Sequence, residues 1–201
     1  MQLPKNARLI RCDTNEHVLA EIECLKHQRI LANTEIDKRW WNDLGEFGLI
    51  GDPNEQPDRS WDWRAICARA SNRLDSEVRG IRTSDGRIQA VTSYTIGKSS
   101  VLEPGQKAIY VDRLATAPWN RAVLVQDPQY DRCGLTLIRF VVVHSHLLGL
   151  KGRVNLTAVA HVDFYLDLGF VETRERNGDG TIYELSTEAA RRLMEDRRGA
   201  V

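Results

Sequence analysis

An apolar segment that stands between two strand-like segments constrains the fold of this chain more than any other feature. Residues 134–148 carry apolar side chains at helical spacing, namely Leu135, Leu137, Ile138, Phe140, Val141 and Val142. Residues 107–116 before this segment and 154–159 after it read as strands. A helix between two strands is the usual connection of a parallel pair. We therefore expect a parallel crossover at this point of the chain.

Antiparallel strands are expected on both sides of this unit. Residues 77–83 and 87–96 read as strands, and Ser84-Asp85-Gly86 between them is a strong hairpin signal because glycine tolerates a positive φ. The C-terminal part predicts a short helix, two strands around an Asn177-Gly178-Asp179-Gly180 turn, and a last amphipathic helix, at 162–168, 170–174, 181–185 and 186–198. This order predicts an α/β (α+β) fold.

The N-terminal third predicts one strand and two helices. Residues 7–12 read as the strand, and a helix is expected over 15–31 with Asp13 as its N-cap. Turn-forming residues indicate a loop over 45–59, and a second helix is expected over 61–74. We expect a single domain over 1–201, made of an N-terminal segment, a core and a C-terminal helix, at 1–60, 61–185 and 186–201.

Composition argues against several classes of protein. The 201 residues include 28 Lys plus Arg and 28 Asp plus Glu, so the formal net charge is zero, whereas a general nucleic-acid binder carries a basic excess. The four cysteines form no CxxC pair, which indicates neither a zinc site nor a disulfide framework. The N-terminus lacks a signal-peptide core, and the apolar runs fall short of the roughly 20 residues that span a bilayer. We expect a cytoplasmic protein that binds no nucleic acid, membrane or metal.

Three short motifs follow one another between residues 110 and 170. Leu114-Ala115-Thr116-Ala117-Pro118 closes a strand, Gln129-Tyr130-Asp131-Arg132-Cys133-Gly134 leads into the apolar helix, and Phe164-Tyr165 precedes Gly169-Phe170. In order and spacing they resemble the GNAT N-acetyltransferase superfamily, with its patterns L-A-V-x-P, Q/R-x-x-G-x-G/A and F-Y-x-x-x-G-F. The resemblance covers residues 75–185. It departs from the pattern at Arg132, where the family usually has its first glycine.

The resemblance implies a GNAT-type acyl-CoA N-acyltransferase fold, with a central mixed, mostly antiparallel sheet flanked by helices, and acetyl-CoA as acyl donor without a metal. A loop that feeds a helix N-terminus presents unpaired N–H groups and the positive end of the helix dipole, which suits a pyrophosphate. On the resemblance, these amides hold the CoA pyrophosphate, and the pantetheine arm pairs with the preceding strand. The implied cofactor-binding residues are Leu114, Ala115, Thr116, Gln129, Arg132, Cys133, Gly134 and Leu135. Taken alone, Gly134 is equally consistent with two interpretations: a close approach to a phosphate, or only a tight entry of the chain into the helix.

Three side chains are candidates for acid or base chemistry. On the resemblance, Tyr165 protonates the departing thiolate, since a neutral phenol keeps its proton near neutral pH. Asp112 is the candidate base and by alternation is expected to share a face with Tyr110 and Leu114. A pairing of Asp112 with a surface arginine is the alternative interpretation. His161 is a second candidate base.

The tryptophans are the last feature of note. Trp40, Trp41, Trp61 and Trp63 fall in the region where the family builds its acceptor site, and core packing is the alternative interpretation. Trp119, in a long loop, is expected to cover the cofactor or to form an interface.

The resemblance predicts an N-acetyltransferase that transfers the acetyl group directly to a primary amine of a small molecule or a protein. One alternative is a non-catalytic acyl-CoA-binding sensor or interaction module, suggested by Arg132 and by Ala158 where the family often has an asparagine. Another is a structural protein that keeps only the scaffold. A possible homodimer is expected to pair through an edge strand such as Thr181–Leu185. The sequence leaves the acceptor open.

Overall fold

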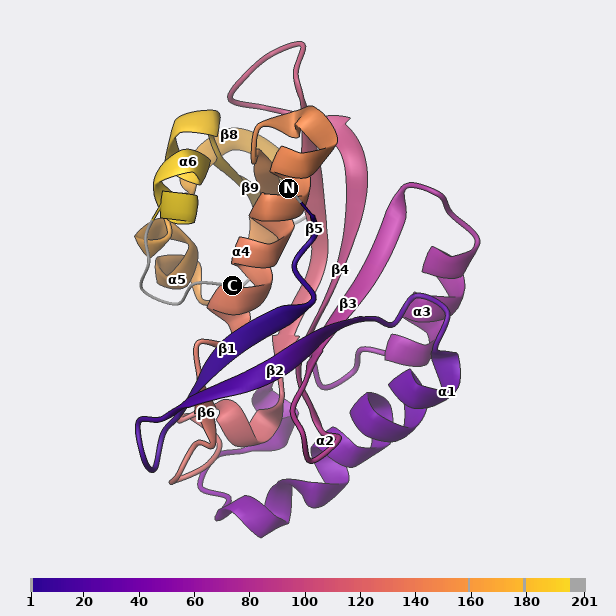
Figure 1. Ribbon diagram of the computed structural model, residues 1–201, viewed down its shortest axis with the longest axis vertical. Helices are drawn as coiled ribbons and strands as arrows, with labels where there is room; N and C mark the ends of the chain where they lie inside the picture. The colour runs from indigo at the N-terminus through magenta and orange to yellow at the C-terminus, as the bar shows by residue number, and fades with distance from the viewer. Residues whose placement is uncertain (1, 159, 179, 196–201) are drawn as a thin grey trace.

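Among the residues that the structure describes, nine strands form one sheet in the order β6-β1-β2-β3-β4-β5-β7-β9-β8 (Figure 1). The computed structural model describes residues 2–158, 160–178 and 180–195. The strands are β1 (Asn6–Arg11), β2 (His17–Cys24), β3 (Ser76–Arg82), β4 (Ile88–Ser99), β5 (Lys107–Thr116), β6 (Tyr130–Asp131), β7 (Val154–Ala158), β8 (Val171–Asn177) and β9 (Gly180–Leu185). The N-terminal segment therefore contributes two strands to the same sheet as the core.

Helices connect these strands and cover the sheet. In chain order they are α1 (Arg29–Leu31), η1 (Ala32–Lys38), α2 (Arg39–Asn42), η2 (Asp43–Phe47), η3 (Pro53–Glu55), α3 (Trp63–Ser71), η4 (Pro118–Asn120), α4 (Cys133–Ser145), η5 (His146–Leu150), α5 (Val162–Asp167) and α6 (Thr187–Glu195). The first four are consecutive, so a single helical stretch runs from α1 to η2.

The parallel crossover predicted from the apolar segment is confirmed. β5 and β7 pair in parallel, and α4 with η5 connects them. The other pairings between the named strands are antiparallel. The expected α/β class, with a mixed, mostly antiparallel sheet flanked by helices, is likewise confirmed.

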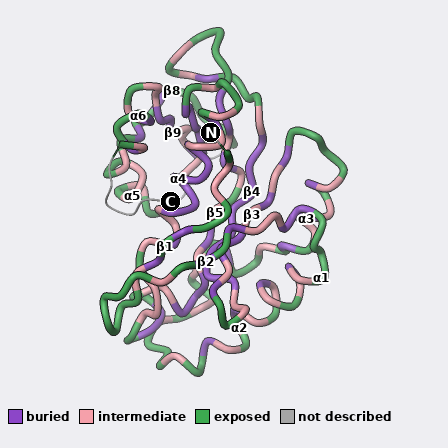
Figure 2. Tube along the Cα trace, viewed as in Figure 1, coloured by how far each residue is buried: buried purple, intermediate pink, exposed green. Residues whose placement is uncertain are grey.

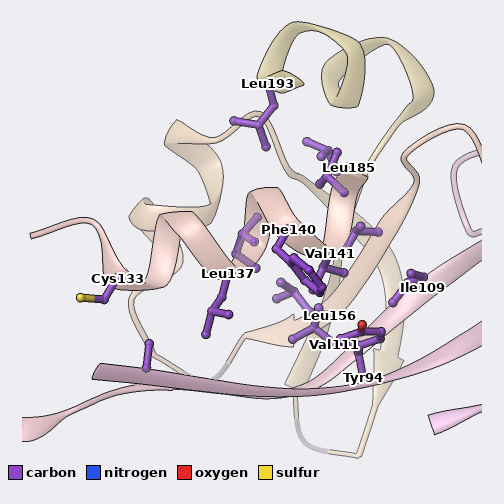
Figure 3. Packing of buried hydrophobic residues seen from close by; sticks show 14 of the residues in the cluster. Tyr94, Ile109, Val111, Cys133, Leu137, Phe140, Val141, Leu156, Leu185 and Leu193 are labelled. Atoms are coloured by element: carbon purple, nitrogen blue, oxygen red, sulfur yellow. The ribbon is translucent and has the colours of Figure 1, made fainter. Parts of the chain in front are cut away.

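Two separate cores lie on the two faces of the sheet. On one face, α4 places Leu137, Phe140 and Val141 over Tyr94 of β4 and Val111 of β5 (Figure 3). The buried stretches of α4 and of the central strands in Figure 2 follow this packing. An apolar helix of this kind is buried on most of its circumference, which explains why its sequence shows only a weak polar face.

The opposite face is covered by the helical stretch from α1 to α2 and by α3. Trp40 and Trp63 are 1% and 2% exposed and pack there with Val91 of β4. For these two tryptophans the core-packing interpretation is confirmed. Trp119 is completely buried in the same cluster, and its Nε1 donates to Gln89 Oε1 at 2.9 Å. The expectation that Trp119 covers a cofactor or forms an interface is therefore wrong.

The helix expected over residues 15–31 is wrong except at its last three residues, because residues 17–24 form β2, which pairs with β1 as a hairpin. Asn15 takes a φ of 56° in the hairpin turn, and Asp13 accepts hydrogen bonds from Arg11 instead of capping a helix. Ala20 and Ile22 face the core, whereas Leu19 is 64% exposed. A period of two therefore describes this segment better than the helical spacing that suggested a helix. The helix begins only at α1.

The strand expected at the edge is interior. β9 pairs with β7 on one side and with β8 on the other, so Thr181–Leu185 offers no free edge. The described edges of the sheet are β6 and β8. The order of a sheet is set by long-range pairing and does not follow the order of strands along the chain.

The remaining predicted elements lie within a few residues of their predicted bounds. The helical residues 32–47 and the short elements η3, η4 and β6 were not predicted. Three predicted features extend outside the described residues: the end of the 154–159 strand at 159, the turn at 179, and the last helix at 196–198.

One described helix, Cys133–Leu150, is long and apolar enough to cross a membrane by length and composition. The expectation that every apolar run is too short is therefore wrong. More than half of this helix is buried against the sheet, which accounts for its apolar composition.

We predict that Phe140→Ala lowers the free energy of unfolding by about 3–5 kcal/mol, because it leaves a cavity between α4 and the sheet. Urea denaturation measures this change. Leu74→Ala is the control, since Leu74 is fully exposed, and its effect should stay within about 0.5 kcal/mol. A Phe140→Ala variant as stable as the control would contradict the core described above.

Candidate active site

The parallel pairing between β5 and β7 ends after three residue pairs. The paired residues are Ile109 with Val154, Tyr110 with Asn155, and Val111 with Leu156. β5 continues to Thr116 and β7 to Ala158, yet among the described residues no further pairs join them. Beyond Val111, one edge of β5 therefore faces a gap.

The backbone groups at that edge follow from the pairing of β5 with β4. Ala117 donates its N–H to Gln89 O of β4. Because successive residues of a strand point their N–H and C=O groups to opposite sides, those of Thr116 and Leu114 point toward the gap. The carbonyl of Thr116 already has a partner, because Arg121 Nε donates a hydrogen bond to it at 3.0 Å. The N–H of Leu114 and the N–H of Thr116 remain directed at the gap.

The N-terminus of α4 faces the same region. Arg132 is the N-cap residue, has a φ of 64° and makes no side-chain cap. Left-handed backbone is the conformation that glycine adopts most easily, which explains the family preference for glycine at this position. The first-turn amides of Cys133, Gly134 and Leu135 have no helical acceptor. They form an uncapped, positively polarised helix end.

A carboxylate lies next to this helix end. Asp131 Oδ1 accepts from the N–H of Arg132, and the Arg132 guanidinium lies 3.6 Å from Asp131 Oδ2. The Arg132 side chain is about one-third exposed. Its guanidinium is thus available to a phosphate, while the nearby carboxylate weakens the attraction of the helix end for an anion.

A cavity of about 960 Å³ joins the β5–β7 gap to the start of α4. Except for Gln129, the predicted cofactor-binding residues all line it: Leu114, Ala115, Thr116, Arg132, Cys133, Gly134 and Leu135. Gln129 instead supports the loop through its backbone, where its N–H donates to Trp119 O and its carbonyl accepts from Cys12 N. A Cβ added at Gly134 would lie 3.7 Å from Phe164 and Thr116, an ordinary contact distance. Gly134 therefore leaves the cavity wider there.

Cys133 contributes backbone only. Its side chain is 2% exposed, and burial raises the pKa of its thiol well above the ordinary value. The thiol stays protonated at neutral pH and is not a nucleophile.

Tyr165 projects into the cavity from α5. Its ring packs edge-on against Phe164 and Phe170, with centroids 5.0 and 5.8 Å away. Burial raises the pKa of Tyr165 to about 12. Within the described chain its hydroxyl has no hydrogen-bond partner, so the phenol is neutral at physiological pH and has its proton available.

Asp112 sits at a β-bulge. Tyr94 of β4 pairs with Val111 and Ser93 with Arg113, so Asp112 is an extra residue on β5. Its Oδ2 accepts from Thr95 Oγ1 at 2.8 Å.

The bulge changes which residues of β5 share a face. Thr95 pairs with Tyr110, so Asp112 and Tyr110 lie on one face, as expected. Leu114 packs with the core under α4 on the other face, so the expectation that it shares a face with Asp112 is wrong. Simple alternation fails here because the bulge inserts one residue.

The carboxyl of Asp112 lines the cavity and is largely buried. Burial raises its pKa above the ordinary value, an effect that the Thr95 hydroxyl, Lys98 and Arg113 partly oppose. Arg113 lies with its guanidinium over the Trp61 ring, 5.0 Å from the centroid, and its Nη1 donates to the backbone carbonyl of Asp112. The Asp112 carboxyl therefore forms no short ion pair with Arg113.

Two other residues singled out in the sequence line the cavity. His161, the second candidate base, is exposed and has a φ of 54° at the start of α5. Trp61 lines the cavity near Arg113, unlike the buried Trp40 and Trp63.

Sequence reasoning missed two groups of polar residues in the cavity wall. Asn177 Nδ2 donates to the Tyr110 hydroxyl at 2.8 Å, and that hydroxyl lies 2.8 Å from Thr157 Oγ1. Arg121 forms a bidentate pair with Asp58, which ties the segment after η3 to the end of β5. Asn177 was interpreted as a turn residue, and no sequence signal links Arg121 to a carboxylate 63 residues away.

Among the described residues, no group of three or more His, Cys, Asp or Glu side chains could hold a metal ion. The cavity lining combines backbone amides with the side chains of Tyr165, Asp112 and His161.

No family model matches the chain, and no curated protein matches it in sequence. Solved structures do match it in shape. The AtaT toxin bound to the C-terminus of the antitoxin AtaR superposes with a TM-score of 0.55 at 14% identity, over 88% of this chain and 98% of that one. AtaTR bound with AcCoA gives 0.54 at 14% identity, over 87% and 97%. Apo FdhC, a nucleotide-linked sugar GNAT, gives 0.54 at 9% identity, over 93% of each chain.

This protein has the GNAT fold. The fold that the three motifs imply is thus confirmed. One of these structural neighbours, AtaTR, has been solved with AcCoA bound. At 9–14% identity the likeness concerns the fold, so the roles of individual residues rest on the geometry given above.

We predict that Asp112→Asn is at least as stable as the wild type at neutral pH. A carboxyl whose pKa is raised by folding destabilises the folded state above that pKa, and this effect disappears as pH falls below the unfolded value of about 3.9. The two proteins should therefore converge in melting temperature toward acid pH. Calorimetry between pH 4 and pH 8 measures the melting temperatures of the wild type and the variant.

Asp58→Asn is the matched control, because Asp58 is a buried carboxylate that Arg121 pairs with directly. Its loss should lower stability by about 1–3 kcal/mol at neutral pH. A strongly destabilised Asp112→Asn variant would show that the Asp112 charge has a structural role.

Proposed function

We propose that this protein is an acetyl-CoA-dependent N-acetyltransferase that transfers an acetyl group to a primary amine in a ternary complex. One observation carries the proposal: the gap between β5 and β7 exposes backbone groups of β5 in a cavity that also contains an uncapped helix end and a neutral phenol. The extended arm of acetyl-CoA, its pyrophosphate and its thioester each need one of these three features.

The residues of the cavity fit acetyl-CoA. The amides of Cys133, Gly134 and Leu135 would hold the pyrophosphate, with the Arg132 guanidinium on an outer phosphate oxygen. The edge of β5 from Leu114 to Thr116 would pair with the pantetheine arm as an added strand does. Gln129 would act only through the loop that it supports.

Bound acetyl-CoA supplies an acyl group activated as a thioester. The N–H of Leu114, directed at the gap, is placed to stabilise negative charge on an acyl oxygen. Tyr165 holds a proton on its hydroxyl and can give it to a thiolate. Asp112, once ionised, can take a proton from the acceptor ammonium, directly or through one water. The chain itself thus offers a proton donor, Tyr165, and a candidate base, Asp112.

The acceptor is proposed to be a small molecule or a protein with a primary amine. Structural neighbours include a nucleotide-linked sugar GNAT and a toxin bound to its antitoxin, so a small-molecule acceptor and a protein partner both have precedents on this fold. A homodimer remains part of the proposal, but it would have to use a surface other than β9.

A second candidate function is a non-catalytic acyl-CoA-binding module. One observation favours it: the Asp131 carboxylate accepts a hydrogen bond from the Arg132 N–H. This places a negative charge beside the helix end that would bind a pyrophosphate. In this case acetyl-CoA would bind without turnover of any amine.

We predict that Gly134→Glu weakens acetyl-CoA binding by about 100-fold or more, because it places a carboxylate at the helix end that would hold the pyrophosphate. Isothermal titration calorimetry measures the dissociation constant. Gly45→Glu is the control, since a side chain at Gly45 meets nothing within 4 Å and Gly45 is outside the cavity lining. Equal binding by both variants, or no binding by the wild type, would overturn the proposal.

We predict that Tyr165→Phe lowers kcat about 100-fold or more while the dissociation constant of acetyl-CoA changes less than about twofold. The variant removes the proton donor and keeps the ring that packs on Phe164 and Phe170. Release of the CoA thiol measures turnover. An unchanged kcat would exclude Tyr165 as the acid, and binding without turnover in the wild type would favour the non-catalytic module.

A further inference from the structure

A second hollow of about 560 Å³ adjoins the cavity. It shares Tyr110, Asp112 and Asn177 with the larger cavity, so these three residues form the boundary between the two. The rest of its lining includes Lys98, Ser99, Asn155 and Glu175. The second hollow therefore lies on the Asp112 side of the proposed reaction centre.

Asn155 of β7 has an unsatisfied polar atom in this lining. The residue is 3% exposed, and its Nδ2 donates to Ser99 O at 3.1 Å. Because a carbonyl oxygen can only accept, this bond fixes the orientation of the carboxamide. Its Oδ1 then has no hydrogen-bond partner within the described residues. Buried carbonyl oxygens are rarely left unpaired, since an unmade hydrogen bond is costly.

The position of Asn155 relative to Asp112 follows from the sheet. Asn155 pairs with Tyr110, and Asp112 lies two residues further along β5. Strand spacing and rise separate the two backbone positions by roughly 8 Å. A molecule with a chain of four or five carbons would span this separation.

The charges of the second hollow point to a ligand that donates hydrogen bonds. Asp112 and Glu175 are carboxylates, Asn155 Oδ1 is an acceptor, and Lys98 is the cation of the lining. A distal ammonium or hydroxyl would satisfy Oδ1. A distal carboxylate would oppose both Oδ1 and Glu175.

We propose that the second hollow binds the far end of the amine acceptor and that Asn155 Oδ1 accepts a hydrogen bond from it. This inference rests on the proposed function. It assigns the acceptor to small primary amines that carry a second hydrogen-bond donor, an ammonium or a hydroxyl, at the other end of a four- or five-carbon chain. Asn155 would then determine specificity without contacting the reacting atoms.

The test uses a matched series of amines on the full chain: 1,4-diaminobutane, 4-aminobutan-1-ol and butylamine. Their dissociation constants are measured by NMR titration in the absence of acetyl-CoA, for the wild type and for Asn155→Leu. Ser145→Ala is the control, because it removes one buried hydroxyl that donates to Arg153 O, and both residues lie outside the two hollows. Asn155→Asp, which keeps the size of the side chain and an oxygen acceptor, is a second variant in case the leucine variant does not fold.

We expect the wild type to bind the two amines with a distal donor at least tenfold more tightly than butylamine. Asn155→Leu should lose this preference, while Ser145→Ala keeps it and Asn155→Asp keeps it for 1,4-diaminobutane. A wild type without the preference, or an Asn155→Leu variant that retains it, would overturn the inference and leave a buried water as the partner of Oδ1. Failure of the proposed function is scored separately, as absence of acetyl-CoA binding or of CoA release with any of these amines.

Discussion

The early separation of β5 from β7 is the constraint on which the rest of the site depends. Parallel strands normally satisfy each other's backbone groups along their length, and here the pairing ends at Val111 and Leu156. The N–H groups of Leu114 and Thr116 are left facing a cavity in the middle of a nine-stranded sheet. Edge groups of this kind need a hydrogen-bond partner, either water or an extended ligand.

α4 positions an uncapped helix end beside the gap. Phe140 and Val141 anchor the helix to β4 and β5, so the position of its first turn follows from the packing of its middle (Figure 3). The same helix that connects the two strands thus directs its amides at the place where they separate. Arg132 enters the helix with a positive φ, and Gly134 leaves the wall without a side chain. These local features have their effect only because the helix is held in place by the core.

The N-terminal segment closes the other side of the cavity. Arg121 joins the carbonyl of Thr116 to the carboxylate of Asp58, and Trp61 stacks under Arg113 at the cavity wall. Asp112 is the extra residue of the β-bulge in β5. It lines both the cavity and the second hollow. The fold therefore separates two tasks: one side of the sheet presents donors suited to a cofactor, and the other presents acceptors suited to an amine. The GNAT fold by itself fixes neither the acceptor nor turnover, because function depends on the residues of the site.

Local sequence signals were enough for part of this picture. The apolar run of α4, the Ser84-Asp85-Gly86 hairpin and the three motifs around Thr116, Gly134 and Tyr165 were sufficient to predict the class of fold and the part of the cavity lining that those motifs supply. The other features depend on how distant elements pack together. Residues 17–24 are compatible with a helical and with an alternating pattern, and pairing with β1 and β3 selects the strand. The bulge at Asp112, the Arg121–Asp58 pair and the unpaired Oδ1 of Asn155 all depend on residues far apart in the chain. Such contacts leave no periodic signal in a sequence, because they arise where separate elements meet.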